Sequence, residues 1–330
     1  MKHNFYKAFE ARFRGEREEI KKRQAIYLPL VKPVCKKHPQ KPVVDIGAGR
    51  GEWLESLQEQ EILAEGYDVD KALVEEAVGY GLQVKEEDGV EALTKMPDAS
   101  VCVVTAFHVV EHLPFDRWMK LIREANRILV PGGVLILETP NPENIRVASE
   151  HFYLDPTHRN PIPARLLAFG VEYGGFERAS IVRLQENPCF ASEVRASIHQ
   201  VLEGPSQDYA VVGQKDGDND LFEQIGDSLA RLAQGLSFEE TVRRFEERLL
   251  AYDRYLLEAA VREEKRDISA LEHAVHILKE ELDIVHEALN GLQTSHHGLA
   301  EAFHMSQQKP QTLYGQFIDW FQEVMNRIKK

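Results

Sequence analysis

The strongest constraint on the fold is a short apolar segment that runs into three alternating glycines. Residues 43–51 read VVDIGAGRG. The β-branched run is short and bounded by glycine, which predicts a buried strand rather than a helix. Glycines at the end of such a strand let the backbone turn tightly and approach a ligand, because they adopt positive φ without a steric penalty. In open α/β sheets, nucleotide-like ligands bind beyond the carboxyl ends of the strands, so this segment predicts such a site.

Strand and helix patterns alternate from Val43 to about Leu184. This alternation predicts βαβ units, and therefore a parallel sheet. Residues 164–184 are expected to close the domain with an antiparallel pair. The expected strands after the first cover 62–69, 82–85, 101–106 and 134–138, and the expected helices between them cover 52–60, 72–80 and 115–129.

Further motifs make the glycine segment more specific. Asp45 precedes the first glycine and gives the form D-x-G-x-G-x-G, in which the third glycine comes one residue earlier than in a dinucleotide fingerprint. Residues 111–113 read EHL, and residues 129–135 fit L-x-P-G-G-x-L. Residues 139–144 read TPNPEN and residues 155–158 read DPTH. Together these segments resemble class I S-adenosylmethionine (SAM) methyltransferases, and the last two are similar to elements of bacterial methyltransferases found with cell-surface polysaccharide genes.

The resemblance implies a fold class, a cofactor and a set of cofactor-binding residues. The expected fold is α/β, a doubly wound Rossmann-like class I methyltransferase domain at residues 1–202, followed by a long α-helical coiled coil. The expected cofactor is SAM. An acidic residue at the end of the second strand is placed to accept hydrogen bonds from ribose hydroxyls, with Asp68 as first choice and Asp70 as second. The other expected cofactor-binding residues are Asp45, Gly47, Gly49, Gly51, Phe107 and Asp88, although Asp88-Gly89 also fits an ordinary turn.

The chain begins with a helical pattern ahead of the first strand. Residues 4–31 place apolar side chains roughly on one face, with a break expected near Gly15. Pro33 and residues 36–42 predict a linker into the first strand. Three arginines lie on this segment, and two interpretations stay open: they face an anionic ligand such as the SAM carboxylate, or they form a solvated charged face. These arginines are Arg12, Arg14 and Arg17, of which Arg14 is the candidate for cofactor binding.

A proline-rich polar loop after the fifth strand carries the expected catalytic residues. Prolines at this density exclude a regular helix or strand interior, and polar loops beside a ligand site commonly carry function. A sugar hydroxyl must lose its proton as it accepts a methyl group, and histidine suits that task. We expect His158 to be the base, with Asp155 orienting it or sharing the role and His112 and Tyr153 as further candidates; alternatively, His158 only caps the loop. No metal site is expected, because the i, i+4 spacing of His108 and His112 lacks a third ligand.

The second half of the chain is predicted to be helical and oligomeric. Residues 203–220 are rich in Gly, Asp and Pro, which predicts a linker. Residues 221–308 form a helical region without proline, and its coiled-coil repeat is clearest at 261–303. The repeat predicts a homo-oligomer, dimer or trimer, rather than a helix packed on its own domain. Residues 311–330 predict an amphipathic helix that contacts a membrane surface or docks within the oligomer. The a and d positions are Ile268, Leu271, Val275, Leu278, Leu282, Val285, Leu289, Leu292, His296, Leu299 and Phe303.

These features combine into one functional hypothesis and two alternatives. The chain is expected to be a SAM-dependent O-methyltransferase that acts on a sugar of a bacterial surface glycan and caps the non-reducing end of O-antigen polysaccharide. This hypothesis implies a glycan or lipid-linked polysaccharide acceptor and a glycosyltransferase or polymerase partner, with the coiled coil as oligomeriser and spacer. The alternatives are a methyltransferase for a small diffusible acceptor and a non-catalytic coiled-coil scaffold.

Charge and hydropathy set the expected partners and location. The net charge of −14 argues against a duplex nucleic-acid partner, which usually meets a clustered basic surface. The chain shows neither an apolar secretory signal nor a run of eighteen apolar residues. We therefore expect a cytoplasmic protein, with peripheral contact at the inner face of the cytoplasmic membrane through the C-terminal helix.

Overall fold

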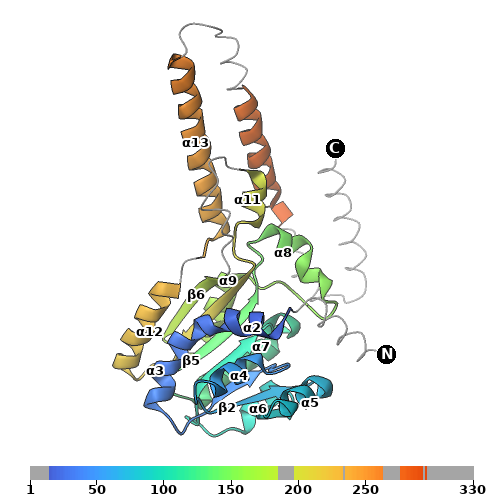
Figure 1. Ribbon diagram of the computed structural model, residues 1–330, viewed down its shortest axis with the longest axis vertical. Helices are drawn as coiled ribbons and strands as arrows, with labels where there is room; N and C mark the ends of the chain where they lie inside the picture. The colour runs from blue at the N-terminus through green and yellow to red at the C-terminus, as the bar shows by residue number, and fades with distance from the viewer. Residues whose placement is uncertain (1–14, 185–196, 233–234, 263–275, 293, 296–330) are drawn as a thin grey trace. The chain divides into compact units, whose positions relative to one another are not determined.

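The structure is a computed structural model of the chain (Figure 1). Contacts within the chain divide it into two compact units, residues 1–248 and 249–330. The first unit contains an α/β domain built on one seven-stranded sheet. The described residues are 15–184, 197–232, 235–262, 276–292 and 294–295.

The sheet has the strand order β3-β2-β1-β4-β5-β7-β6. Strands β1 to β5 are parallel, and β7 runs antiparallel between β5 and β6. The order reverses between β1 and β4, so the carboxyl ends of these two neighbours mark the switch point at which α/β sheets bind ligands. The strands are β1 (Val43–Ile46), β2 (Ala64–Asp68), β3 (Val84–Glu86), β4 (Val101–Phe107), β5 (Leu129–Pro140), β6 (Arg178–Leu184) and β7 (Asp208–Gln214).

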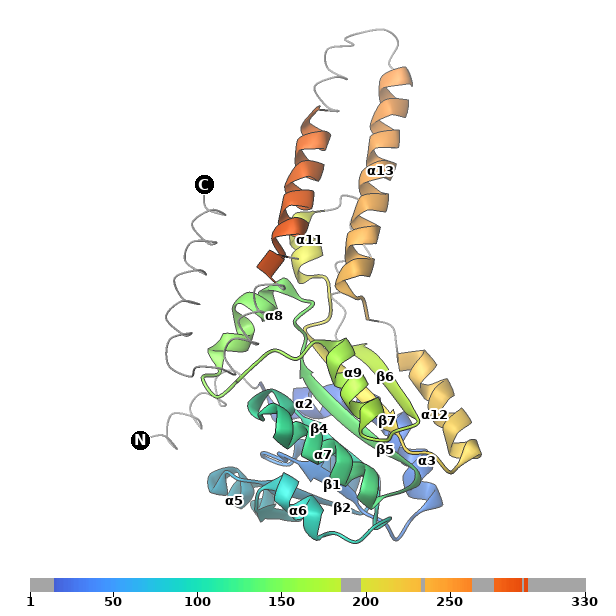
Figure 2. The ribbon, with the colours of Figure 1, turned by 180° about the vertical axis from the view of Figure 1, so that it is seen from behind.

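Helices cover both faces of the sheet, which Figures 1 and 2 show from opposite sides. One face carries α3 (Leu28–Lys37), α4 (Glu52–Gln58) and α12 (Asn219–Leu232), and the other carries α6 (Gly89–Lys95), α7 (Phe115–Ile128) and α9 (Ala164–Tyr173). The remaining elements are α2 (Arg17–Gln24), η1 (Ala25–Tyr27), α5 (Lys71–Gly79), η2 (Val110–His112), α8 (Ile145–Ser149), η3 (His151–Leu154), α11 (Ile198–Glu203) and α13 (Phe238–Arg262).

Alternating side chains of the central strands build a core on each face of the sheet. On β5, Leu135 and Leu137 pack with α7 and α9, whereas Val134 and Ile136 pack with α3 and α12. All four are fully buried, as expected for strands that are covered on both faces and therefore read as continuous apolar runs. The expected strands and helices from Val43 onward are thus present, and β5 begins earlier than expected, at Leu129.

The expected linker after the N-terminal helices is shorter than predicted, because α3 continues through Pro33 to Lys37. Proline lacks the N–H group that would bond to the carbonyl four residues earlier. That carbonyl, of Pro29, instead accepts a hydrogen bond of 3.4 Å from the hydroxyl of Ser228 in α12. Burial of apolar side chains on α3, among them Val34, holds the helix against the sheet.

The prediction of a linker at residues 203–220 is wrong. Residues 208–214 form β7, all seven of them buried, and β7 pairs with both β5 and β6. Without β7 the sheet would end at β5 and leave β6 without a neighbour. The methyltransferase-like domain therefore extends beyond the predicted boundary at residue 202. The prediction missed this strand because its apolar run, residues 209–212, is short and is flanked by glycine, proline and aspartate residues that are typical of a linker.

The described part of the C-terminal region is helical. Residues 276–292 form one helix, and within it Leu278, Leu282, Val285, Leu289 and Leu292 are all partly or fully covered, whereas most other positions are exposed. These five are predicted a and d positions. The rest of the predicted coiled coil, including residues 263–275, and the predicted amphipathic helix at 311–330 lie outside the described residues. Among the helices that the structure describes, none combines the length and the apolar character that a membrane span requires.

Candidate active site

A glycine loop connects β1 to α4 at the switch point of the sheet. Gly47, Gly49 and Gly51 have φ angles of 69°, 54° and 79°, in the left-handed region that glycine adopts without strain. A Cβ atom on Gly47 would lie 2.5 Å from a methyl group of Val109, the second residue after β4. The loop therefore lies against the segment that follows β4, as the glycine pattern predicts.

Asp68 links the end of β2 to this loop. One carboxylate oxygen accepts a 2.8 Å hydrogen bond from the backbone N–H of Gly49, and the other accepts one of 2.8 Å from the N–H of Asp70. A carboxylate oxygen accepts more than one hydrogen bond. Asp68 therefore holds the loop, and its oxygens keep the capacity to accept further hydrogen bonds.

The other predicted acidic residues, Asp70, Asp88 and Asp45, each make hydrogen bonds or ion pairs within the protein. Asp70 caps α5 by accepting from the N–H groups of Ala72 and Leu73. Asp88 caps α6 and also pairs with the guanidinium of Arg117 at 2.6 Å. Asp45 is buried and accepts a 2.6 Å hydrogen bond from the hydroxyl of Thr105 on β4, which ties β1 to β4 below the glycine loop.

Of the other predicted cofactor-binding residues, the structure describes Phe107 but not Arg14. Phe107, at the end of β4, packs against the rings of Tyr27 and Trp53, with centroids 5.3 and 5.6 Å away. Arg14 lies outside the described residues. Its neighbour Arg17 pairs with Glu55 of α4 at 2.6 Å, so the structure gives this arginine a role in packing α2 against α4.

His108 lies where β4 ends, with three carboxylates around it. It is a non-glycine residue with φ of 55°, and backbone strain of this kind is concentrated at functional sites. Its Nδ1 lies 3.3 Å from Glu111, and its Nε2 lies 3.3 Å from Glu138 and 3.9 Å from Asp208. Burial alone lowers the pKa of His108, but the carboxylates outweigh it and raise the pKa well above its ordinary value. The surrounding carboxylates thus favour the protonated form of His108.

The N-terminal cap contributes to the same group of charges. Tyr27 donates a 2.5 Å hydrogen bond to Glu138, and Arg23 pairs with Asp208 at 3.0 Å. Burial, and then the charge of Glu138, raises the pKa of Tyr27 well above its ordinary value, so the phenol stays a donor. Asp208 comes from β7, the strand that lies within the predicted linker.

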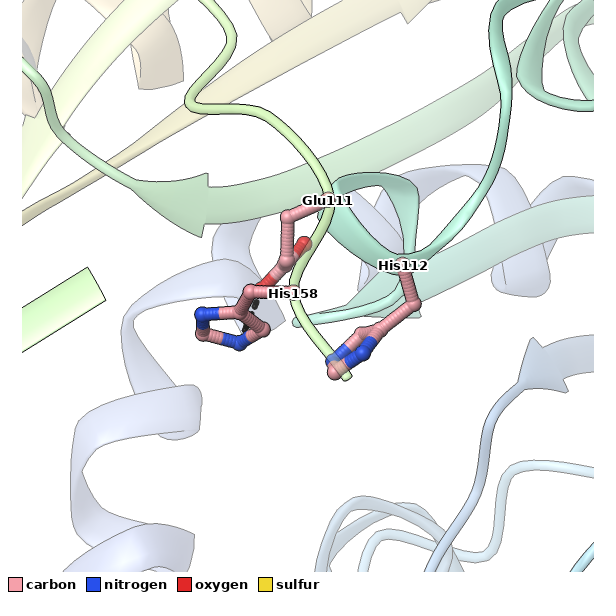
Figure 3. Close-up of side chains that lie close together, drawn as sticks. All are labelled: Glu111, His112 and His158. Carbon is pink, nitrogen blue, oxygen red and sulfur yellow. Dashed lines mark ion pairs between the residues drawn. The ribbon is translucent and has the colours of Figure 1, made fainter. Parts of the chain in front are cut away.

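Glu111, His112 and His158 form a second polar group beside His108 (Figure 3). Glu111 and His112 belong to η2, and His158 comes from the loop after η3. The two imidazole rings lie 4.6 Å apart between centroids, and Nε2 of His158 is 4.0 Å from Oε1 of Glu111. One nitrogen or oxygen atom from each of the three residues lies within 4.8 Å of the other two. The structure thus brings together two predicted catalytic residues, His112 and His158.

The hydrogen bonds of His158 determine which of its nitrogens carries a proton. Its Nδ1 lies 2.6 Å from the carbonyl oxygen of Phe152, which only accepts. Nδ1 must therefore be protonated, and in the neutral ring Nε2 holds a lone pair. That nitrogen is the one that lies toward Glu111.

His112 is oriented by a different chain of contacts. Its Nδ1 lies 2.9 Å from the hydroxyl of Thr157, which in turn lies 2.6 Å from a carboxylate oxygen of Asp155. Because the Thr157 proton goes to the carboxylate, Nδ1 of His112 is the donor and its Nε2 holds the lone pair. Burial lowers the pKa of His112, and the carboxylate of Glu111 opposes this shift only in part.

These contacts change one predicted pairing. Asp155 was expected to orient His158, but its carboxylate contacts Thr157 and so acts on His112, while the Phe152 carbonyl orients His158. Tyr153, also a predicted catalytic residue, is half exposed and packs edge-on against Phe152.

Sequence reasoning did not single out several residues of the site. Glu111 stands in the EHL motif and Thr157 in the DPTH motif, so both had a signal that was used only for the resemblance. Glu138 and Asp208 had no such signal, because their place beside His108 depends on the pairing of β5 with β7.

Comparison with known proteins agrees with this architecture. A model of the methyltransferase domain family matches residues 19–178. A probable S-adenosylmethionine-dependent methyltransferase of Mycolicibacterium smegmatis is 33% identical over 135 residues, which are 41% of this chain and 51% of the relative. The chain thus spans about half the length of this curated relative. The crystal structure of a SAM-dependent methyltransferase from Archaeoglobus fulgidus is 29% identical, with a TM-score of 0.58, and is covered completely by 64% of this chain.

The sheet order, the glycine loop at the switch point and these matches support one another. Strand order 3-2-1-4-5-7-6, with only the seventh strand antiparallel, accounts for the whole described sheet. The structure therefore has the Rossmann-like α/β methyltransferase fold with a seven-stranded sheet, and the similarity of residues 19–178 to the methyltransferase domain family and to SAM-dependent methyltransferases supports an enzyme domain with S-adenosylmethionine as its cofactor.

Proposed function

We propose that this chain transfers a methyl group from SAM to a hydroxyl of a sugar in a bacterial surface glycan. The observation that carries the chemistry is the pair of histidines whose Nδ1 atoms are held by hydrogen bonds, so that each neutral ring presents Nε2 as its base, next to the glycine loop at the switch point of the sheet. The loop reaches this pair through Val109, which contacts Gly47 and precedes η2.

The cofactor would be held by the glycine loop and by Asp68, with Asp45 bracing the loop from below. Phe107 would lie beside it at the end of β4, and Asp70 and Asp88 would act mainly by capping the helices that border the site. SAM supplies a methyl group on a positively charged sulfonium. The protein must then align the acceptor oxygen with that carbon, which is the main source of acceleration for such a displacement.

His158 is the base in this proposal. As the new oxygen–carbon bond forms and the carbon–sulfur bond breaks, the acceptor oxygen must release its proton. Nε2 of His158 has a lone pair, and the Phe152 carbonyl prevents the ring from turning that nitrogen away. His112 is the neighbouring second base, held by Thr157 and Asp155. Tyr153, which is half exposed, would contact the acceptor in this proposal rather than take its proton.

Support for a glycan acceptor comes from the two motifs that resemble methyltransferases of surface-polysaccharide gene groups. Residues 139–144 and 155–158 both reach this site, because Thr139 donates a 2.9 Å hydrogen bond to Glu111 and Asp155 acts on His112. In the finer form of the proposal, methylation of the non-reducing end stops extension of O-antigen polysaccharide. The predicted coiled coil would form a dimer or trimer and separate the active site from a membrane-borne polymerase, with residues 311–330 contacting the inner face of the membrane.

The proposal is tested by following labelled methyl from SAM into the glycolipid fraction of cells that make the glycan. Wild type is compared with Asp68→Ala, with His158→Asn and with the control His199→Ala, which changes an exposed histidine on α11. Label in polysaccharide-bearing lipid, retained in the control and lost in the other two, is the expected result. Label found only in small molecules would favour a diffusible acceptor, and a folded protein that fails to bind SAM would favour a scaffold.

A further inference from the structure

We propose that Glu111, His112 and His158 together bind one divalent transition-metal cation, which holds the acceptor oxygen. This inference rests on the proposed methyl transfer for its role but not for its binding. Two imidazole nitrogens and one carboxylate oxygen form a donor set that suits Zn²⁺, Co²⁺, Mn²⁺ or Fe²⁺, whereas Mg²⁺ and Ca²⁺ prefer oxygen ligands alone. The three ligand atoms already lie within 4.8 Å of one another. Bonds of about 2.1 Å to a shared cation require them within about 3 to 4 Å, which small side-chain rotations supply.

Both histidines are oriented by a hydrogen bond at Nδ1, as is common for histidines that bind a metal. A histidine that binds a metal usually donates its other ring N–H to a carbonyl or a carboxylate, which fixes the tautomer and the ring orientation. His158 does so through Nδ1 to the carbonyl of Phe152. His112 does so through Nδ1 to Thr157, whose hydroxyl continues to Asp155. Both Nε2 atoms therefore keep a lone pair for a ligand.

Glu111 gives the independent observation that points to a missing partner. Its side chain is fully buried, and Oε2 accepts a hydrogen bond from Thr139. Oε1 has no accessible surface and no hydrogen bond from the described residues. His108 Nδ1 forms an ion pair with this oxygen at 3.3 Å but no hydrogen bond to it. A buried carboxylate oxygen without a hydrogen bond is costly even beside one positive charge, and a bound cation would give Oε1 the direct partner that it lacks.

The neighbouring group of His108, Glu138 and Asp208 is a poorer candidate, although its ligand atoms also lie close together. Both nitrogens of His108 already lie beside carboxylate oxygens, 3.3 Å from Glu111 and 3.3 Å from Glu138, so neither is left to bind a metal. This group instead sets the local charge. Glu138 and Asp208 offset the charge of His108, and Glu111 and Asp155 leave the region around the proposed site negative. A divalent cation is therefore attracted rather than repelled.

The cation would change the way in which the acceptor loses its proton. A metal-bound hydroxyl has a lowered pKa, so the coordinated acceptor hydroxyl would release its proton to solvent water before or as its oxygen accepts the methyl group. His158 would then be a ligand instead of the base. If the metal is absent, the proposed methyl transfer stands with His158 as the base, so the two proposals fail separately.

The first test is binding of Co²⁺ and Zn²⁺ to the full chain after removal of metals with EDTA and dialysis. The expected result is one equivalent of Co²⁺ with visible absorption bands, displaced by Zn²⁺. Glu111→Gln, His112→Asn and His158→Asn should each abolish this binding; the asparagines can still donate to the partners of Nδ1 while they remove Nε2. Thr157→Val, which disturbs only the support of His112, should weaken affinity about 10- to 100-fold.

Two controls and two contrary results make the binding test decisive. His199→Ala, and a double change of His296 and His297 to alanine, should leave the Co²⁺ titration unchanged, because none of these histidines is one of the three proposed ligands. The absence of stoichiometric binding in folded wild type would overturn the proposal. Binding that survives in the three ligand variants, or that is lost in the double variant, would overturn it as well.

The second test addresses the role of the metal. Methyl transfer to the glycan should be lost after EDTA treatment and restored by one equivalent of Zn²⁺ or Co²⁺, with SAM affinity unchanged. Full transfer by the metal-free enzyme would overturn the role of the cation and leave the proposed function in place. Failure to bind SAM, by contrast, would refute the proposed function and leave the metal titration valid.

Discussion

At the scale of single residues, two aspartates two positions apart have different roles. Asp68 accepts from the glycine loop and is our candidate for the ribose hydroxyls, whereas Asp70 caps α5. Asp68→Ala should weaken SAM affinity about 10- to 100-fold, because hydrogen bonds to a charged group contribute about 1.5 to 3 kcal/mol. Asp70→Ala should cost about 1 kcal/mol of folding stability and leave SAM affinity within about twofold. Calorimetric titration and urea unfolding of both variants check this, and equal losses of SAM affinity would contradict it.

The sequence predicted which side chains gather at the site better than how they pair. The glycines, Asp68, His112 and His158 follow from motifs whose spacing has a physical reason, and all lie near the switch point of the sheet. The prediction has Asp155 orienting His158 or sharing its role. The pairing of Asp155 with His112 depends on a loop geometry in which Thr157 stands between them. No local pattern encodes that geometry.

At the scale of elements, α2 is attached to α4 by a group of charges around Glu55. Arg17 and Lys21 lie 2.6 and 3.2 Å from its carboxylate. Burial raises the pKa of Glu55, but the two cations more than offset burial and lower the pKa below 4.5. The unfolded chain therefore takes up this proton first as the pH falls. The stabilisation from Glu55 is present above pH 4.5 and is lost as the pH falls through the lower, folded-state pKa.

Because the stabilisation from Glu55 is lost at low pH, the effect of Glu55→Gln on stability should depend on pH. The loss in the free energy of unfolding should be larger at pH 7 than at pH 4, as measured by urea unfolding at both values. Glu75→Gln is the matched control on α5, because its carboxylate is 69% exposed and its pair with Lys71 is 3.8 Å long. Exposed pairs contribute little, so the control should change stability by at most a few tenths of a kcal/mol. A Glu55 effect that is independent of pH would contradict the assignment.

The position of β7, the last strand along the chain, allows a test of where the domain ends. A chain of residues 1–202 lacks β7, so β5 and β6 lose the strand between them. That chain should show no cooperative unfolding and no SAM binding, whereas residues 1–248 should show both. Circular dichroism during thermal unfolding and calorimetric titration with SAM provide the measurements. A folded, SAM-binding 1–202 fragment would show that β7 is dispensable.

The elements also show what a local pattern can predict. Strands β1 to β5 alternate with helices and follow apolar runs, so their order and parallel direction follow from short stretches of sequence. β7 returns to pair with β5 after more than sixty residues of other structure, between Pro140 and Asp208. Long-range antiparallel pairing leaves no signature within the strand itself, and the polar residues around it resemble a linker.

At the scale of the whole molecule, the described residues of the candidate site all belong to the first compact unit, residues 1–248. The second unit contributes a helix at residues 276–292 whose covered positions coincide with the predicted heptad seam. The proposed chemistry and the predicted assembly thus fall in different parts of the chain. If the second unit serves as oligomeriser and spacer, its length and its register should have separable effects.

Deletions within the helix at residues 276–292 separate length from register. Removing residues 282–288 takes out one heptad, keeps the 3-4 repeat, and shortens the helix by about 10 Å at 1.5 Å per residue. This variant should keep its oligomeric state in sedimentation experiments and should shift the surface polysaccharide toward shorter chains on gels. Removing residues 282–286 shortens the helix by a similar length but misplaces Leu289 and Leu292, so it should lose both assembly and control of chain length. If neither deletion changes the oligomeric state, the heptad seam does not hold the oligomer together. An interface through the seam would be disrupted by the change of register, whereas an interface elsewhere in the chain would not.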